Sequence, residues 1–556
     1  MEKKLSPATR IFKLVRQDKS EITAVYFYAI LAGLIQLSLP VGIQSIINFV
    51  LGGSMSASLV VLIILVVLGV LVTGIIYINQ MKLIEKIQQK IFVRYAIEFA
   101  DHIPRIDLKK ADAFYLPELV NRFFEIPSLQ KGLSKLLLDI PTATIQIFFG
   151  LLLLSLYHPA FILFGVLLVV TLGVILYYTG AKGLRTSLAE SAYKYRAAAW
   201  LEELARVVKS FKLSKGTSLH LKKADEHTIN YLHARTNHFS VLIFQYRFLV
   251  AIKTIITAAM LLVGSFLLIN QQLNIGQFIA AEIVILIVIS AVEKLITTLD
   301  NVYDVLTSVE KMGKLTDKPI EETGTALLES KSSGVSVELN NVSFRFANTG
   351  NIIDRLTFSI SPGEKVCISG QEGSGKSTLL KLLAGSYSDF SGSILIDNIP
   401  IRNYNLDSLR SKTGIYISQQ DIFHGTLLEN ITMGNPVFNI NEINESAEKI
   451  GLRPFITSLK YGFETELDPV GNHLPGNVIR KILLLRAILN KPRLILLEEP
   501  WHGFPEDQRK KVQQLILKET ENSTVIIISN DEEFKSACDK VIYLYEEGKQ
   551  IVQNSK

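Results

Sequence analysis

Long uncharged stretches in the first half of the chain predict helices that cross a membrane. No Lys, Arg, Asp or Glu occurs at residues 22–81, 140–181 or 254–281. One membrane-spanning helix needs about 20 predominantly apolar residues, so the first two stretches hold about two spans each and the third holds one to two. With the flanking residues included, we predict six spans, at residues 24–50, 59–80, 136–156, 159–180, 248–269 and 276–299.

The connections between these spans alternate in charge, and this alternation predicts the topology. Residues 51–58, 157–158 and 270–276 contain no Lys or Arg, whereas residues 82–135 and 182–247 are rich in both. Basic connections stay on the cytoplasmic side of a membrane. We therefore expect a multi-pass protein of the cytoplasmic (inner) membrane, with both termini in the cytoplasm and only short loops outside.

The two basic connections are long, and their sequences favour helices. Residues 187–208 contain no Pro or Gly and place Ala, Leu, Glu, Lys and Arg at helical spacing. We expect spans two to five to continue as rods below the bilayer, where they could pass force to a soluble domain. The alternative, solvated loops, is disfavoured because loops of this length are rarely structureless.

Three ionisable residues, Arg247, Lys253 and Glu282, lie within or close to the last two spans. A charge at membrane depth is costly unless it faces a partner or a wet cavity. Counting from the outer helix ends at about 1.5 Å per residue, Lys253 lies about 24 Å deep and Glu282 about 9 Å deep, so we expect no direct pair within one chain. Glu282 either lines a substrate path or serves as a packing residue or a contact across a dimer.

Composition excludes other classes of protein. Hydrophobic residues make up 48% of the 556 positions and charged residues only 20%, which excludes a purely soluble chain. The net charge of +6 is explained by membrane topology and does not indicate nucleic-acid binding. The two cysteines, Cys367 and Cys538, are too few for a disulfide framework, so we expect reduced thiols. The basic N-terminus and the apolar run after it are interpreted as a retained first span rather than a signal peptide, since the run is too long.

Near Lys311 the pattern changes from apolar spans to a soluble domain. Residues 317–336 are polar and poor in aromatic side chains, which is typical of a linker, and alternating strands and helices follow. The fold we predict is an α-helical six-span transmembrane domain followed by an α/β P-loop ATPase domain. Its boundaries are a transmembrane domain at residues 1–312, a linker at 313–334 and a nucleotide-binding domain at 335–556.

A glycine-rich motif in the second domain predicts phosphate binding. It begins at Gly370, reads Gly-Gln-Glu-Gly-Ser-Gly-Lys-Ser-Thr, follows an apolar strand at residues 365–369 and precedes a helix at 378–384. The glycines let backbone N–H groups converge on phosphate oxygens at the N-terminus of that helix. In this motif Lys376 contacts the β and γ phosphates of a nucleotide and Ser377 ligates Mg²⁺.

A second apolar strand, at residues 494–497, ends in two carboxylates, Glu498 and Glu499. Beside a P-loop, a strand that delivers two acids suits nucleotide hydrolysis. One acid orders the water shell of the metal ion, and the other positions the attacking water.

At this point the chain resembles ATP-binding cassette (ABC) exporters of the half-transporter type, in which six spans and one ATPase domain are fused. The resemblance covers nearly the whole chain, and residues 37–44 are similar to the first span of exporters of bacteriocins, haemolysins and other secreted polypeptides. The resemblance implies that Phe346 stacks on adenine. It also implies that Gln419, with Gln420 as the alternative, is the glutamine of the family's glutamine loop. No N-terminal peptidase domain is expected, because about 23 residues precede the first span.

The chain departs from the family pattern at four places. The signature Leu-Ser-Gly-Gly-Gln reads Leu-Pro-Gly-Asn-Val at residues 474–478, so Pro475 supplies neither the hydroxyl nor the N–H that the family directs at the γ-phosphate. Pro505 stands for the D-loop aspartate, Asn530 for the switch histidine, and Glu498 for the Walker B aspartate. The candidate general base, Glu499, is retained.

The motifs and the resemblance together define a set of candidate site residues. The candidate nucleotide-binding residues are Phe346, Gly370, Gly373, Ser374, Gly375, Lys376, Ser377, Thr378, Pro475, Gly476 and Asn477; the candidate catalytic residues are Glu499, Gln419 and Asn530; and the candidate metal ligands are Ser377, Gln419 and Glu498.

The resemblance implies ATP and Mg²⁺ as cofactors and an ATPase that drives export of a substrate as a dimer. The substrate could be a peptide, a protein, a lipid or another hydrophobic compound. The dimer could be a homodimer or a heterodimer with another half-transporter, with a membrane-fusion adaptor as a further candidate partner. The alternative function is an ATP-binding regulatory half-transporter that hydrolyses ATP poorly and pairs with a competent subunit.

Overall fold

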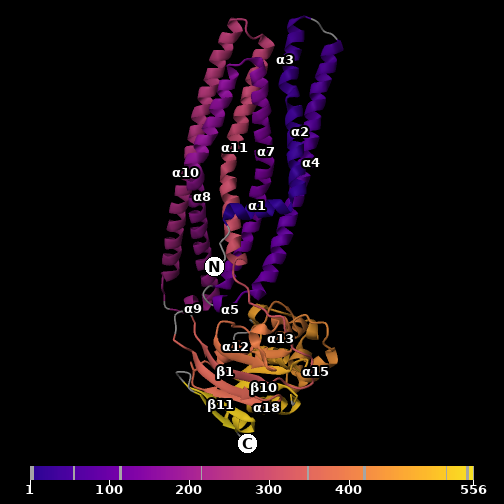
Figure 1. Cartoon of the computed structure of the whole chain (residues 1–556), viewed down its shortest axis with the longest axis vertical. Coiled ribbons are helices and arrows are strands. Elements are labelled where there is room, and N and C mark those ends of the chain that lie inside the picture. The colour runs from indigo at the N-terminus through magenta and orange to yellow at the C-terminus, as the bar shows by residue number, and fades with distance from the viewer. Residues whose placement is uncertain are drawn as a thin grey trace. The chain divides into compact units, whose positions relative to one another are not determined.

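The computed structural model describes residues 6–53, 57–111, 115–214, 216–346, 350–417, 421–471, 473–520, 522–545 and 550–554 (Figure 1). The chain divides into two compact units. The first is helical and comprises Met1–Pro104 and Tyr115–Lys318, and the second is an α/β unit that comprises Arg105–Phe114 and Pro319–Lys556.

The helical unit contains six helices or helix pairs long and apolar enough to cross a membrane, which confirms the six predicted spans. The main helices are α1 (Pro7–Gln17), α2 (Lys19–Gln36), α3 (Ser38–Leu51), α4 (Ala57–His102), α6 (Leu116–Val120), α7 (Glu125–Tyr157), α8 (Phe161–Arg206), α9 (Val208–Leu213), α10 (Leu219–Ile269) and α11 (Ile275–Thr316).

Helices continue beyond the predicted spans, as expected. Helix α8 continues from the fourth span without a break to Arg206, and α10 begins at Leu219, well before the predicted start of the fifth span. Helix α11 begins with a capping box, in which Asn274 and Gln277 each accept a hydrogen bond from the other's backbone N–H. This reciprocal cap fixes the short turn between α10 and α11.

The first span, predicted at residues 24–50, consists of two helices. Helix α2 ends at Gln36 and α3 begins at Ser38. Pro40 has no N–H to donate to the carbonyl of Gln36, and its ring crowds that carbonyl. The interruption at Leu37 therefore has a local covalent cause.

Small residues let α11 pack closely on α7. A methyl group added to Gly150 would lie 2.5 Å from Val288 Cγ2, and one added to Gly132 would lie 2.5 Å from Val305 Cγ2. Glycine at these two positions removes the side chain that would hold the helices apart, as is common where helices meet in a bilayer.

Two lysines of the spans have partners that the sequence analysis did not find. Lys253 Nζ lies 2.9 Å from Glu293 Oε2 on α11, and Lys294 Nζ lies 2.8 Å from Asp139 Oδ1 on α7. The expectation that Lys253 does not pair directly with Glu282 within one chain is confirmed.

Two sheets form the centre of the α/β unit. A six-stranded sheet has the order β12-β11-β3-β10-β9-β6, and a four-stranded sheet has the order β2-β1-β4-β5. Their strands are β1 (Val337–Phe344), β2 (Ile353–Ile360), β3 (Lys365–Gly370), β4 (Ser391–Ile396), β5 (Ile399–Pro400), β6 (Thr413–Tyr416), β9 (Leu494–Glu498), β10 (Thr524–Ile528), β11 (Lys540–Leu544) and β12 (Gln550–Asn554).

The larger sheet is covered on both faces, which is the usual state of parallel strands. On β3, Val366 and Ile368 belong to the core that includes the four-stranded sheet and helix α12 (Lys376–Leu383), whereas Cys367 belongs to the opposite core. The opposite core contains α17 (Gly476–Ile488) and α18 (Glu506–Glu519). Successive side chains along each strand point to opposite faces of the sheet, so each strand contributes residues to both cores.

A short piece of the N-terminal half belongs to the α/β unit. The backbone N–H of Asp107 donates to the carbonyl of Pro319 at 3.0 Å. In helix α5 (Leu108–Ala111), Lys109 Nζ lies 2.7 Å from Asp389 Oδ2 and 4.8 Å from the ring centre of Phe344. Residues 105–111 are therefore attached to the same unit that carries the P-loop.

Candidate nucleotide-binding site

The P-loop connects the central strand β3 to helix α12, as the sequence predicts. Gly373 and Gly375 have φ angles of +83° and +86°, a conformation that side-chain-bearing residues rarely adopt. At Gly370 an added Cβ would lie 2.0 Å from the carbonyl oxygen of Leu544. These glycines allow the sharp loop that directs backbone N–H groups toward the N-terminus of α12.

Lys376 is the first residue of α12, and its side chain folds back over the loop. Its Nζ donates to the carbonyl oxygens of Gly370 at 2.7 Å and Gln371 at 2.5 Å. Ser374 is buried below it, with its Oγ 3.4 Å from the same nitrogen. Burial lowers the pKa of Lys376, while the nearby carboxylates of Glu499, Glu372 and Glu498 act in the opposite direction. The two loop carbonyls thus hold the ammonium group of Lys376 by accepting its hydrogen bonds. Phosphate oxygens of a bound nucleotide could take the place of these acceptors.

Ser377 and Glu498 are brought together from α12 and the end of β9. The hydroxyl of Ser377 donates to Oε1 of Glu498. A hydroxyl and a carboxylate are hard oxygen ligands of the kind that Mg²⁺ prefers, so this pair fits the predicted metal site. Thr378, the next residue of α12, is half-buried beside them.

Glu499 follows the strand with a φ angle of +43°, and its N–H donates to the carbonyl of Ile528 at 3.0 Å. Burial raises the pKa of its carboxyl group, and the neighbouring Glu498 charge adds to this effect. His502, a backbone hydrogen bond from Asn530 and Lys376 oppose the rise in pKa. A strained, half-buried acid next to a phosphate loop is the arrangement expected of a general base.

Asn530 lies after β10, beside Glu499. Its Oδ1 accepts a hydrogen bond of 3.0 Å from Ser369 Oγ at the end of β3. The sequence analysis did not identify Ser369 as a site residue. The only sequence signal that could have indicated this role is its position directly before the P-loop. Ser369 fixes the amide of Asn530, a side chain that cannot carry a proton but can still hydrogen-bond.

Phe346 lies at the edge of the core near the P-loop. Its ring contacts Phe344 and Tyr387, with centroid separations of 5.1 and 5.8 Å. Both contacts are edge-to-face, a favourable geometry for aromatic rings. The neighbouring aromatic rings thus position Phe346, and its stacking on adenine stays a prediction.

The altered signature forms the start of helix α17. Pro475 is the N-cap and is exposed, and the carbonyl of Pro475 accepts from the N–H groups of Val478 and Ile479. Gly476 is exposed and Asn477 is half-buried. Proline suits this end of a helix because no N–H is required of it there. The substitution thus preserves the helix while removing a donor.

Other expectations have mixed outcomes. Gln419 and its rival Gln420 lie outside the described residues. Pro505 is the N-cap of α18 and is exposed. Cys367 and Cys538 are both buried and are not joined to each other by a disulfide.

The comparison with protein families accounts for both units. Residues 22–292 match the ABC transporter transmembrane region, and residues 353–502 match the ABC transporter domain. The chain belongs to the ABC transporter family. It is an integral membrane protein in which the transmembrane and ATPase domains of the family are fused, and the family ATPase domain implies ATP binding.

Known ABC exporters are similar to this ABC transporter. The alpha-hemolysin translocation ATP-binding protein HlyB of Escherichia coli O157:H7 is 30% identical over 48% of this chain and 38% of its own length. The leukotoxin export ATP-binding protein LtxB of Aggregatibacter actinomycetemcomitans is 27% identical over 50% of this chain and 40% of its own. The chain spans half or less of the length of these relatives.

A solved structure has the same fold. The ATP-bound structure of a bacterial Atm1-family ABC exporter matches with a TM-score of 0.83, 19% identity, and coverage of 96% of this chain and 95% of that one. At this identity the likeness concerns the fold.

Proposed function

We propose that the chain is one half of a dimeric, ATP-driven exporter of the cytoplasmic membrane, with both termini in the cytoplasm. The observation that carries the proposal is the meeting of Lys376, Ser377 and Glu498 at one loop, in a chain that also has six spans. Binding of ATP closes the two nucleotide-binding units of the dimer, and hydrolysis and release reopen them. The spans thereby alternate between inward and outward access.

The residues of the site divide the chemical work. Lys376 and the N–H groups of residues 373–378 hold the phosphates of ATP. Ser377 and Glu498, with Gln419 as a further predicted ligand, would hold Mg²⁺, which neutralises phosphate charge when bound. Glu499 accepts a proton from the attacking water. The backbone N–H of Asn530 donates a hydrogen bond to the carboxylate of Glu499 and holds that side chain in place.

The substrate is proposed at the level of a class. The relatives named for haemolysin translocation and leukotoxin export support a polypeptide, and the apolar spans equally suit a lipid or another hydrophobic compound. A homodimer, a heterodimer with a second half-transporter and a membrane-fusion adaptor are all compatible with this proposal.

The signature segment favours a second candidate function, a regulatory half-transporter that binds ATP but hydrolyses it slowly. Pro475 offers neither hydroxyl nor N–H, Pro505 replaces a carboxylate, and Asn530 replaces a titratable side chain. The phosphate-binding residues are complete, so binding and hydrolysis are expected to separate.

Binding of ATP can be tested directly. Lys376→Ala should abolish the rise in thermal unfolding temperature that Mg-ATP produces for the full chain in lipid nanodiscs. Lys381→Ala, later in the same helix, is the matched control and should keep that rise. Equal stabilisation of Lys376→Ala and the wild type would disprove the assigned site.

A further inference from the structure

Helix α11 carries a continuous stripe of acidic and polar residues. Seven positions follow one another at intervals of three or four: Glu282, Leu286, Ser290, Glu293, Thr297, Asp300 and Asp304. Such intervals place all seven on one face of a helix. We call this face the acidic stripe, because four of its seven members are carboxylates. From Asp304 to Glu282 it extends about 33 Å, close to the thickness of the hydrocarbon core of a bilayer.

Much of the acidic stripe is left uncovered by the rest of the helical unit, whereas Glu282 and Glu293 are half-buried. Leu286 is 48% exposed and the side chain of Asp300 is 47% exposed. Ser290, Thr297 and Asp304 are exposed as well. Many other positions of the same stretch are buried: Ala280, Ala281, Val284, Ile285, Val288, Ile289, Val292 and Ile296.

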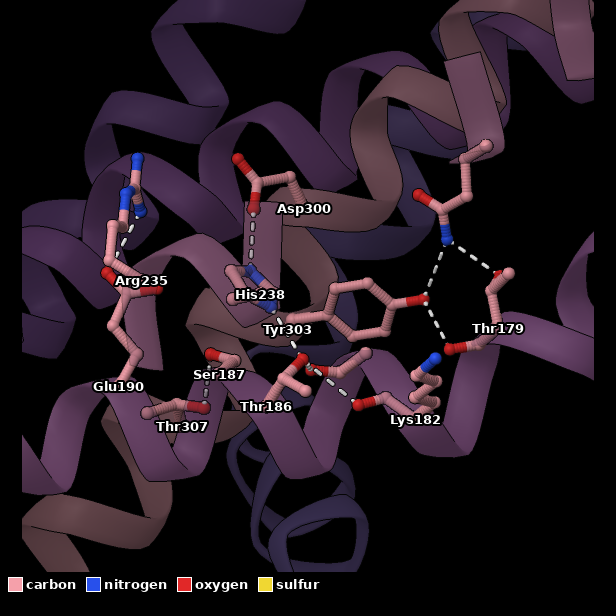
Figure 2. Close-up of polar contacts among 12 residues, drawn as sticks. Thr179, Lys182, Thr186, Ser187, Glu190, Arg235, His238, Asp300, Tyr303 and Thr307 are labelled. Carbon is pink, nitrogen blue, oxygen red and sulfur yellow. Dashed lines mark hydrogen bonds and ion pairs between the residues drawn. The ribbon is translucent and has the colours of Figure 1, made fainter. Parts of the chain in front are cut away.

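Two acids of the stripe have cationic or hydrogen-bonding partners on α10. Glu293 pairs with Lys253 at 2.9 Å. Asp300 Oδ1 lies 3.4 Å from Nε2 of the buried His238, whose Nδ1 lies 2.8 Å from Thr186 Oγ1 on α8 (Figure 2). These contacts orient the stripe toward the side of α10 that bears Lys253 and His238.

Glu282 and Asp304, at the two ends of the stripe, form no ion pair within the part of the chain that the structure describes. Glu282 Oε2 is buried and has no hydrogen-bond partner there. Counting along the two antiparallel helices from the Lys253–Glu293 pair gives Glu282 no ionisable residue at the corresponding position of α10. Glu282 lies eleven residues before Glu293, and the matching position eleven residues after Lys253 is Gly264, which has no side chain. The ring of Phe278 fills the space beside Gly264, 2.6 Å from where a Cβ would lie.

An uncompensated carboxylate in a span is costly in contact with lipid, so the face that bears it borders water or a partner. We propose that the acidic stripe lines the transport path and that the substrate carries a positive charge, as an ammonium or guanidinium group. This inference rests on the proposed export function and narrows its substrate class. Asp304 at the cytoplasmic end receives the cationic group, and Glu282 near the outer end supplies its last counter-charge.

A lipophilic cation, tetraphenylphosphonium, provides a probe of defined charge. Its binding to the full chain in nanodiscs is measured by equilibrium dialysis, with protein-free nanodiscs subtracted. The wild type should bind the cation, and the neutral triphenylphosphine oxide should not displace it. Glu282→Gln should weaken binding about tenfold, as expected for the loss of one partly desolvated charge pair. Glu282→Asp, which keeps the charge, should retain most of the affinity.

Glu226→Gln is the matched control, because Glu226 is an exposed acid on the cytoplasmic part of α10 and lies off the stripe. It should leave binding unchanged. No protein-dependent binding, displacement by the neutral compound, or an equal loss in Glu226→Gln would overturn the proposal. The proposal would also be overturned if Glu282→Gln dissociated a dimer but left tetraphenylphosphonium binding unchanged. The stripe would then face a second copy of the chain.

The experiment separates this inference from the proposed function. The ATP-induced rise in unfolding temperature is recorded on the same Glu282→Gln sample, and its persistence shows that the variant is folded and binds nucleotide. ATP binding without charge-selective probe binding rejects the acidic stripe as a substrate path and leaves the exporter proposal standing. Loss of ATP binding in the wild type rejects the exporter proposal itself.

Discussion

Single residues at the nucleotide site separate ATP binding from hydrolysis. Lys376 and Ser377 are placed by the loop and by Glu498, and these contacts lie within one chain. Pro475, exposed at the start of α17, has no donor to offer to a phosphate. Removing one preorganised donor to developing negative charge typically costs about 3 kcal/mol, or about 10²-fold in rate. The wild-type homodimer should therefore hydrolyse ATP slowly.

Repair of the signature should raise the rate. The double variant Pro475→Ser with Asn477→Gly restores a hydroxyl, an N–H and an unobstructed backbone, and should increase steady-state phosphate release about 10- to 100-fold. The assay uses protein in nanodiscs, with Glu499→Gln as the inactive reference. Pro436→Ser, at an exposed proline outside the motifs, should change nothing. A fast wild-type enzyme that the repair leaves unaltered would mean that other residues contact the γ-phosphate.

The pH dependence of hydrolysis should report the environment of Glu499. Burial raises its pKa above the ordinary glutamate value of 4.5, so the basic carboxylate is lost earlier as the pH falls. We expect kcat to decline on the acid side with a midpoint above 4.5. Glu372→Gln, at an exposed acid of the P-loop, should not move that midpoint. An acid limb at or below 4.5, in protein that ATP still stabilises, would contradict this role for Glu499.

Whole helices are positioned by their smallest residues. Helices α7 and α11 approach each other at Gly132 and Gly150, where valines of α11 occupy the space that a side chain would need. Van der Waals packing replaces the hydrophobic effect as the main force between helices in lipid, so close approach matters there. The contact also fixes the rotation of α11 and hence the direction of the acidic stripe.

A larger side chain at this contact should destabilise the helical unit. In Gly150→Val the new Cβ would start 2.5 Å from Val288 Cγ2, and overpacking of this kind costs about 1–3 kcal/mol. Gly173→Val is the matched control, because nothing lies within 4 Å of a Cβ at that position of α8. Thermal unfolding in nanodiscs should show a lower midpoint for Gly150→Val alone. Equal midpoints for the two variants would show that the α7–α11 contact tolerates bulk.

The whole molecule is organised by the segregation of charge along the chain. Uncharged stretches form the spans, basic connections lie between the pairs of spans, and the ATPase motifs follow. The segment Arg105–Phe114 then joins the α/β unit, through backbone bonds to residues 319–321 and through Lys109.

Topology can be measured on intact cells. A cysteine introduced at Gln272, in the turn before α11, should react with a membrane-impermeant maleimide if the proposed topology is correct. A cysteine at Ser330 should react only after the cells are permeabilised, because basic connections and the second unit stay inside. The native Cys367 and Cys538 are buried and give a low background. Labelling of Ser330→Cys but not Gln272→Cys in intact cells would invert the proposed orientation.

The sequence by itself determined the parts that depend on local chemistry. Runs without charge can only satisfy a bilayer as helices, so the number and approximate limits of the spans followed from the pattern. The order strand, glycine loop and helix placed Lys376 and Ser377, and the acids after the next apolar strand placed Glu498 and Glu499 near them.

Only the tertiary structure decided which distant residues meet. The pairing of Lys253 with Glu293 and of Ser369 with Asn530 joins positions 40 and 161 residues apart, and depends on helix register and strand order. Glu282 Oε2, by contrast, is buried without a hydrogen-bond partner among the residues that the structure describes. These relations have no sequence signal, because a side chain's neighbours across a helix pair are set by rotation and offset of whole elements, which small differences in packing fix.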